Sequence, residues 1–176
     1  MPALEQGLVQ VYTGEGKGKT TAALGLVLRA AGWQLRSYIA QFMKQQPTGE
    51  QQALKRLAPL VTLEQFGRPG FLRPGQVTPE DVALAHRGLD AARAALVGGE
   101  YDLVVLDEVN TAISFGLLDE AEVLEFIDAR PVNVELVLTG RGASEGVLAR
   151  ADLVTRMVEE KHPYRRGLKA RRGIEY

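Results

Sequence analysis

The sequence has 176 residues, 45% of them hydrophobic and 24% charged, which is the composition of one soluble globular domain spanning residues 1–176. Its 21 basic and 22 acidic residues nearly cancel, so we expect no nucleic-acid partner. The absence of cysteine excludes disulfides and thiolate chemistry, and without a signal sequence or a long apolar run we expect a cytoplasmic protein that does not enter a membrane.

Segments of strand and helix character alternate along the chain. Strands are predicted for six short segments, at residues 8–12, 36–42, 61–66, 103–106, 134–138 and 153–158. Helices are predicted at residues 20–31, 50–57, 79–97, 108–115, 119–129 and 145–151. The helix at 79–97 has the clearest start, because Thr78 can cap it and Asp81 completes a capping box. An irregular segment, residues 67–77, precedes this helix, and long loops in compact domains are often functional.

The run GEGKGKTT at residues 14–21, here called the phosphate loop, lies between the first predicted strand and helix. Its glycines leave backbone N–H groups free to converge on phosphate oxygens, and the following helix adds the dipole of its N-terminus. Lys19 would place a charge on the phosphates, and the Thr20 hydroxyl would bind magnesium. The alternative is a flexible glycine turn, which the flanking strand and helix disfavour. We therefore predict an α/β fold of the RecA-like P-loop type, with a mostly parallel sheet of about six strands and helices on both faces.

The phosphate loop differs from the general pattern G-x-x-x-x-G-K-[ST] at one position. Thr13 stands where that pattern has its first glycine. Glu15 is a carboxylate close to the expected phosphates, where it would repel them, so we expect its side chain to point outward.

Two carboxylates, Asp107 and Glu108, follow the apolar run at residues 103–106. That run is apolar at successive positions, as in a strand covered on both faces, which favours a parallel sheet. Ligands of open α/β sheets bind at the carboxyl ends of the strands. Because Mg²⁺ takes few protein oxygens and keeps water, Thr20 with one carboxylate and phosphate oxygens is a sufficient set of ligands. The alternative is a pair of charges that merely ends a strand.

Short motifs outside the phosphate loop follow one another in a fixed order: Gln41-Phe-Met-Lys44, Gly49-Glu50, Gly70-Phe71, Leu106-Asp-Glu108, Thr139-Gly-Arg-Gly142, Lys161-His162, Gly167, Lys169-Ala170 and Gly173-Ile-Glu-Tyr176. In these motifs, and in the threonine before Gly14, the sequence from about residue 7 to residue 176 resembles the ATP:corrinoid adenosyltransferases.

The resemblance implies transfer of the 5′-deoxyadenosyl group of ATP to cobalt(I) of a corrinoid, with triphosphate as the leaving group, in adenosylcobalamin biosynthesis or salvage. The corrinoid would be cobalamin or cobyrinic acid a,c-diamide. Cobalt is then the nucleophile, which agrees with a cysteine-free chain that offers no covalent nucleophile of its own. The chain also offers no electron source, so an external reductase, a flavoprotein, would have to reduce cobalt(II). The resemblance further implies a homodimer.

The resemblance also assigns the ATP site by position. The ATP-binding residues would be Gly14, Glu15, Gly16, Lys17, Gly18, Lys19, Thr20, Thr21, Arg29 and Arg141. Thr20 and Glu108 match the metal ligands, and Mg²⁺ is the implied cofactor. Asp107 would contact the ligands without binding the metal itself. In this family ATP lies with reversed polarity, so that the γ-phosphate is deep in the loop and carbon 5′ points outward.

The catalytic residues would be Lys19, on the triphosphate, and Phe71, on the corrinoid side, where Phe71 and Arg73 would bind the corrinoid. Two differences from the family concern this side. Some members have a tryptophan at the position of Arg73, and some have a longer N-terminal segment that covers the partner subunit's corrinoid. In this sequence the first predicted strand begins only a few residues after Met1, so we expect a more open corrinoid site.

Two further expectations concern residues outside these motifs. We expect Trp33, which follows the first helix, to pack against the sheet. Residues 161–172 contain six Lys or Arg residues, and we expect a tail folded near the substrate rather than a nucleic-acid contact.

Three functions are compatible with the residues themselves: a corrinoid adenosyltransferase, a P-loop ATPase or kinase that releases ADP or phosphate, and a regulatory module that binds ATP without turnover. The identity of the products separates them.

Overall fold

The computed structural model describes residues 4–70 and 72–175. Six parallel strands form one central sheet in the order β3-β2-β4-β5-β1-β6. They are β1 (Val9–Thr13), β2 (Ser37–Phe42), β3 (Val61–Phe66), β4 (Leu103–Asp107), β5 (Glu135–Thr139) and β6 (Leu153–Arg156). The predicted α/β fold is confirmed, and it is consistent with a RecA-like P-loop domain.

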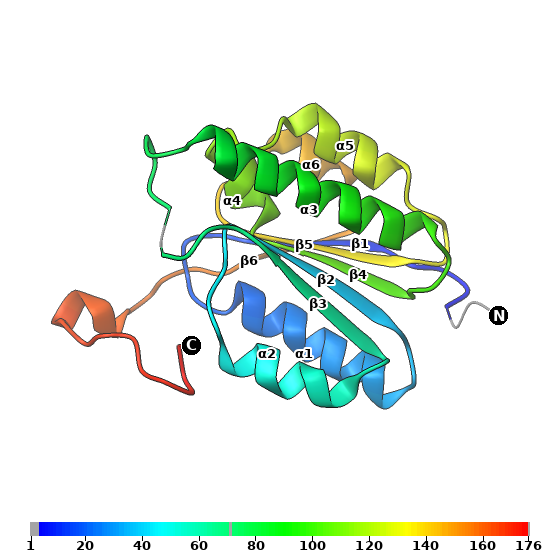
Figure 1. Cartoon of the computed structure of the whole chain (residues 1–176), viewed down its shortest axis with the longest axis horizontal. Helices are drawn as coiled ribbons and strands as arrows, with labels where there is room; N and C mark the ends of the chain where they lie inside the picture. The colour runs from blue at the N-terminus through cyan, green and yellow to red at the C-terminus, as the bar shows by residue number, and fades with distance from the viewer. Residues whose placement is uncertain (1–3, 71, 176) are drawn as a thin grey trace.

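Helices cover both faces of the sheet, as expected. The helical segments are α1 (Lys19–Gly32), α2 (Gly49–Leu54), η1 (Lys55–Leu57), α3 (Pro79–Val97), α4 (Val109–Ser114), α5 (Glu120–Asp128), α6 (Glu145–Arg150) and η2 (Pro163–Arg166). Helices α1 and α2 lie on one face, and α3, α4, α5 and α6 lie on the other (Figure 1). The predicted capping box at the start of α3 is confirmed, because the Thr78 side chain accepts a hydrogen bond from the Asp81 N–H and the Asp81 carboxylate accepts one from the Thr78 N–H.

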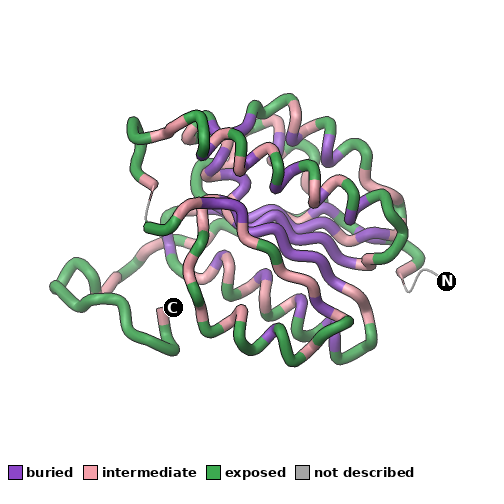
Figure 2. The backbone as a smooth tube through the Cα atoms, in the orientation of Figure 1, coloured by how far each residue is buried: buried purple, intermediate pink, exposed green. Residues whose placement is uncertain are grey.

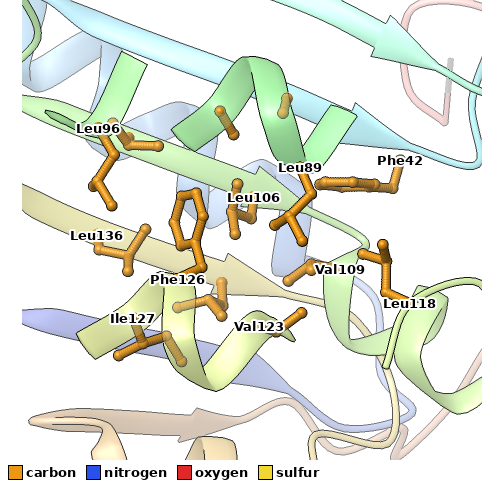
Figure 3. Close-up of a cluster of buried hydrophobic side chains, with 14 of the residues drawn as sticks. Phe42, Leu89, Leu96, Leu106, Val109, Leu118, Val123, Phe126, Ile127 and Leu136 are labelled. Atoms are coloured by element: carbon orange, nitrogen blue, oxygen red, sulfur yellow. The ribbon is translucent and has the colours of Figure 1, made fainter. Parts of the chain in front are cut away.

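The core consists of two apolar layers, one on each side of the sheet. Along β4, Leu103 and Val105 belong to the layer under α1, whereas Val104 and Leu106 belong to the layer under α3 and α5. The strands are accordingly buried between the helices (Figure 2), and the layer on the α3 side holds the aromatic rings of Phe42 and Phe126 (Figure 3). The prediction that this strand is covered on both faces is confirmed.

The carboxyl ends of the parallel strands meet at one edge of the sheet, where α1 also begins. This edge brings together side chains from β1, β2, β4 and β5, whose register sets Gln41 of β2 opposite Asp107 of β4. Residues far apart in the sequence therefore meet at one polar site.

The expectation for Trp33 is wrong, because the residue is 81% exposed. The reason is the way α1 ends. The chain turns away immediately after Gly32, with Gln34 in the left-handed backbone region at φ 63°, and this turn leaves the indole outside the sheet. Within residues 4–70 and 72–175, no helix has the length and hydrophobicity needed to cross a membrane.

Candidate active site

The phosphate loop connects β1 to α1 at the carboxyl edge of the sheet. Gly14 and Gly18 have left-handed backbones, with φ of 100° and 119°. The chain that follows β6 passes over the loop so closely that a Cβ atom on Gly14 would lie 2.5 Å from the carbonyl oxygen of Met157. Glycine is needed at this position for both reasons.

One expectation about the loop glycines is wrong. The N–H of Gly16 donates a 2.8 Å hydrogen bond to the carbonyl oxygen of Met157, so it is not free to bind phosphate. The physical reason is the sheet order: β6 lies beside β1, so the residues after β6 run directly over the loop. Gly16 serves this contact, since a Cβ there would meet the backbone of Val158 at 2.7 Å.

The Lys19 side chain lies inside the phosphate loop and contacts its backbone. Its ammonium donates 2.7 Å hydrogen bonds to the carbonyl oxygens of Gly14 and Gly16, and the residue is only 8% exposed. Burial lowers the pKa of Lys19, and the nearby charge of Arg141 lowers it further, while Glu108, Glu15 and Asp107 oppose the shift. The ammonium is thus placed where an anion entering the loop would gain a charge-assisted partner.

Asp107, at the end of β4, is 1% exposed and accepts four hydrogen bonds. The hydroxyls of Thr20 and Thr139 donate to Oδ1 over 2.8 and 2.7 Å. The amide of Gln41 and the ammonium of Lys44 donate to Oδ2 over 3.0 and 2.7 Å. Burial would raise the pKa of Asp107, but the charge of Lys44 and the hydrogen bonds from Lys44, Thr139 and Thr20 outweigh it and lower the pKa.

Three of these partners, Gln41, Lys44 and Thr139, were not predicted as site residues, although all three lie in motifs that carry the family resemblance. The one signal in the residues themselves was the polar Gln41 between Ala40 and Phe42, near the end of the predicted strand at 36–42. A buried polar residue in a strand requires a partner, but only the fold identifies that partner as Asp107.

Glu108 has a left-handed backbone, with φ 67°, which for a non-glycine residue costs on the order of 1–3 kcal/mol and is found most often at functional sites. Its N–H donates to the Thr139 hydroxyl over 2.9 Å, and its carboxylate accepts a 2.6 Å hydrogen bond from the Thr111 hydroxyl. The Thr111 hydroxyl in turn accepts from the N–H of Arg141 over 3.0 Å. Glu108 is therefore held in one orientation between β4, β5 and α4.

The donor set suits a hard cation that arrives together with phosphate. The side chains of Thr20 and Glu108 supply oxygen atoms only, as Mg²⁺ prefers. Among the described residues, no group of three or more His, Cys, Asp or Glu side chains is placed to hold a metal ion by itself. Two protein ligands completed by phosphate and water are a set that Mg²⁺ accepts.

Charged side chains surround the mouth of the phosphate loop. Arg141 lies 3.5 Å from Glu15, and both are exposed, so Glu15 points outward as expected. Lys17 donates to the carbonyl oxygen of Ile174 over 3.3 Å and lies 3.6 Å from the Glu175 carboxylate. Residues 174 and 175 therefore lie beside the loop.

Two other predicted ATP-binding residues lie along α1. Thr21 is in the first turn and is exposed. Arg29 is in the last turn, roughly 15 Å along the helix axis from Lys19 at 1.5 Å per residue. The structure thus keeps Thr21 at the loop and does not bring Arg29 to it.

The start of the segment at residues 67–77 is tied to α3. The Arg68 guanidinium donates two hydrogen bonds of 2.7 Å to the Asp81 carboxylate, which also accepts from Thr78; we call this pair the Arg68–Asp81 clamp. Arg73 is exposed. Phe71 lies outside the described residues. A cavity of about 130 Å³ lies beneath the segment, lined by residues that include Met43, Phe66, Arg68, Leu72, Asp81 and Leu117.

The strand β1, the phosphate loop, helix α1 and the buried Asp107 define an α/β protein of the P-loop class. The profile of the family described as "ATP:corrinoid adenosyltransferase BtuR/CobO/CobP" matches residues 5–176. Corrinoid adenosyltransferases of Pseudomonas aeruginosa and Escherichia coli are 38% and 34% identical over 173 residues, covering 98% of this chain and 85% and 87% of theirs. The corrinoid adenosyltransferase CobA of Salmonella typhimurium is 35% identical over 173 residues, covering 98% of this chain and 87% of its own. The chain belongs to the ATP:corrinoid adenosyltransferase family.

Proposed function

We propose that this adenosyltransferase transfers the 5′-deoxyadenosyl group of ATP to cobalt(I) of a corrinoid, in adenosylcobalamin biosynthesis or salvage. The electron pair of cobalt(I) forms the bond to carbon 5′, the bond between carbon 5′ and oxygen breaks, and its electron pair leaves with triphosphate. The observation that carries this proposal is the buried Lys19 ammonium inside the phosphate loop of a member of this family. The chain supplies charge and position, and the nucleophile belongs to the substrate.

The triphosphate would contact the phosphate loop, with Lys19, Lys17 and Arg141 as its cationic partners. Lys19 would stabilise the negative charge that develops on the leaving triphosphate. Thr20 and Glu108 would hold Mg²⁺, which when bound neutralises part of the triphosphate charge. Asp107 fixes the Thr20 hydroxyl through their 2.8 Å hydrogen bond and does not itself touch the metal.

The corrinoid would bind on the side of the segment at residues 67–77. Phe71 would lie against one face of the corrinoid ring, and Arg73, which is exposed, would contact its periphery. The Arg68–Asp81 clamp would hold this segment in place, because it ties the start of the segment to α3. ATP would lie with its γ-phosphate deep in the loop, so that carbon 5′ faces the corrinoid.

Cobalt(II) must gain one electron before it can attack ATP. This chain has no cysteine, so the electron would come from a separate reductase, a flavoprotein. We further propose a homodimer that works in the cytoplasm.

The test is incubation of the protein with ATP, Mg²⁺ and chemically reduced cobalamin, followed by the absorbance change of cobalt–carbon bond formation. Growth of the adenosylcobalamin spectrum in the wild-type protein and its loss in Lys19→Ala would support the proposal. ATP consumption that is independent of the corrinoid would instead identify a P-loop ATPase or kinase. Binding of ATP without any product would identify a regulatory module.

A further inference from the structure

Lys44 lies two residues beyond the end of β2, and its side chain turns toward the buried end of β4. Its ammonium is 2.7 Å from Oδ2 of Asp107, with side-chain exposures of 26% for Lys44 and 1% for Asp107. The surrounding backbone fixes this position. The Met43 N–H donates to the Phe66 carbonyl oxygen over 2.9 Å. A Cβ on Gly67 would lie only 2.4 Å from the backbone nitrogen of Lys44.

A second polar chain reaches the same carboxylate oxygen. The amide of Gln41 donates to Oδ2 of Asp107 over 3.0 Å, and Gln41 Oε1 accepts from the amide of Gln65 over 3.0 Å. Gln65 Oε1 in turn accepts from the N–H of Gln46 over 3.1 Å. Oδ2 is thus held by Gln41 of β2 and by Lys44, and Gln65 of β3 in turn holds Gln41.

The Asp107 carboxylate is consequently saturated. A carboxylate offers about four lone-pair positions, and Asp107 accepts two hydrogen bonds on each oxygen. No position is left for a metal ion. The Thr20 hydroxyl has donated its only proton to Oδ1, so its oxygen lone pairs are free to face away from Asp107.

We propose that Lys44 is a positioning residue: it fixes Asp107 so that Asp107 orients the Thr20 oxygen toward the metal that accompanies ATP. The proposal rests on the magnesium role of Thr20 given above. Lys44 does not bind the triphosphate in this account, although it is a lysine at the edge of the nucleotide site. It acts through two intermediates, Asp107 and Thr20, and its contribution is therefore confined to metal-dependent binding.

The test compares ATP affinity in excess Mg²⁺ with ATP affinity in EDTA, by titration calorimetry. Mg²⁺ should raise the ATP affinity of Lys44→Met roughly tenfold less than it raises that of the wild-type protein. This is the effect expected from losing one charged hydrogen bond. Its affinity in EDTA should stay within about twofold of wild type. Lys44→Arg should retain most of the gain. Lys55→Met, which removes an exposed lysine from η1, should match wild type.

Lys44→Met leaves a buried carboxylate without its cation, and this can destabilise the fold. The double variant Lys44→Met with Asp107→Asn removes both charges, and it should show the same loss of the Mg²⁺ gain with a melting temperature closer to wild type.

Three results would overturn the proposal, and each points to a different cause. A full Mg²⁺ gain in Lys44→Met would mean that Lys44 does not position Thr20. Equal losses in Mg²⁺ and in EDTA would mean that Lys44 contacts the triphosphate directly. A wild-type protein that gains nothing from Mg²⁺ would remove the metal role of Thr20, and the role of Lys44 with it.

Discussion

The Thr20 hydroxyl donates a 2.8 Å hydrogen bond to Oδ1 of Asp107, which joins the first turn of α1 to the end of β4. Through this contact the phosphate loop and the acidic strand end form one unit, although 87 residues separate them in the sequence. The neighbouring Glu108 is held by Thr111 and remains partly exposed. The two carboxylates therefore differ in what they can do, and substitutions should separate them.

Glu108→Gln should raise the Mg²⁺ concentration needed for half-maximal activity more than Asp107→Asn does. The Glu108→Gln variant would lose an anionic metal ligand, whereas the Asp107 carboxylate has no lone pair left for the metal. Metal-free ATP should bind Glu108→Gln about as well as it binds the wild-type protein. A Mg²⁺ titration of the three proteins decides the point. If Asp107→Asn shows the larger requirement, Asp107 is the metal ligand.

Lys19→Ala should lower kcat/KM for ATP by about a hundredfold to a thousandfold, or about 3–4 kcal/mol, because the leaving triphosphate loses a buried, positioned cation. Steady-state kinetics with chemically prepared cobalt(I) measures this effect without the reduction step. Circular dichroism of the variant checks its fold. An unchanged kcat/KM in a folded variant would exclude Lys19 from the reaction.

Phe71→Ala should impair the reaction that starts from cobalt(II) much more than the reaction that starts from cobalt(I). If the ring covers the lower face of the corrinoid, it displaces the axial ligand and leaves cobalt(II) four-coordinate, which eases reduction. Arg73→Ala should have a smaller effect, because a charged side chain is a poorer cover for that face. Electron paramagnetic resonance of protein, ATP and cobalt(II) corrinoid reports the coordination. A four-coordinate signal that persists in Phe71→Ala would rule out this role.

The Arg68–Asp81 clamp should make stability depend on pH in acid. The hydrogen bonds from Arg68 lower the pKa of Asp81 to about 2, against the opposing effect of burial and with help from Thr78. Its reference value is 3.8. Because the folded pKa lies below the unfolded one, this stabilisation is present above pH 3.8 and is lost as the pH falls from there toward 2.

Asp81→Asn should therefore reduce the free energy of unfolding at pH 6 by about 1–2 kcal/mol. This figure allows for solvent screening, because Arg68 is partly exposed. The difference between variant and wild type should shrink as the pH falls below 4. Urea unfolding at several pH values measures both quantities. A difference that stays constant with pH would mean that the clamp's charge contributes nothing.

Local patterns in the sequence predicted most of the fold. Short runs of four to seven residues located all six strands, and Thr78 and Asp81 located the start of α3, because these signals depend on near neighbours. The phosphate loop was predicted for the same reason: strand, glycines and helix are consecutive in the chain.

The features that sequence reasoning missed depend on contacts between distant segments. Gln41, Lys44 and Thr139 meet at Asp107 only because the sheet places β2 and β5 on either side of β4. The Gly16 N–H is used by Met157 because β6 pairs with β1. No local pattern carries this information.

The central claim is that ATP is cleaved between carbon 5′ and oxygen, and phosphorus NMR of the products tests it most directly. The protein is incubated with ATP, Mg²⁺ and chemically reduced cobalamin until the adenosylcobalamin spectrum stops growing. The account predicts intact triphosphate in an amount equal to the adenosylcobalamin formed, with no triphosphate when cobalamin is left out. ADP with phosphate, or triphosphate released without cobalamin, would contradict it.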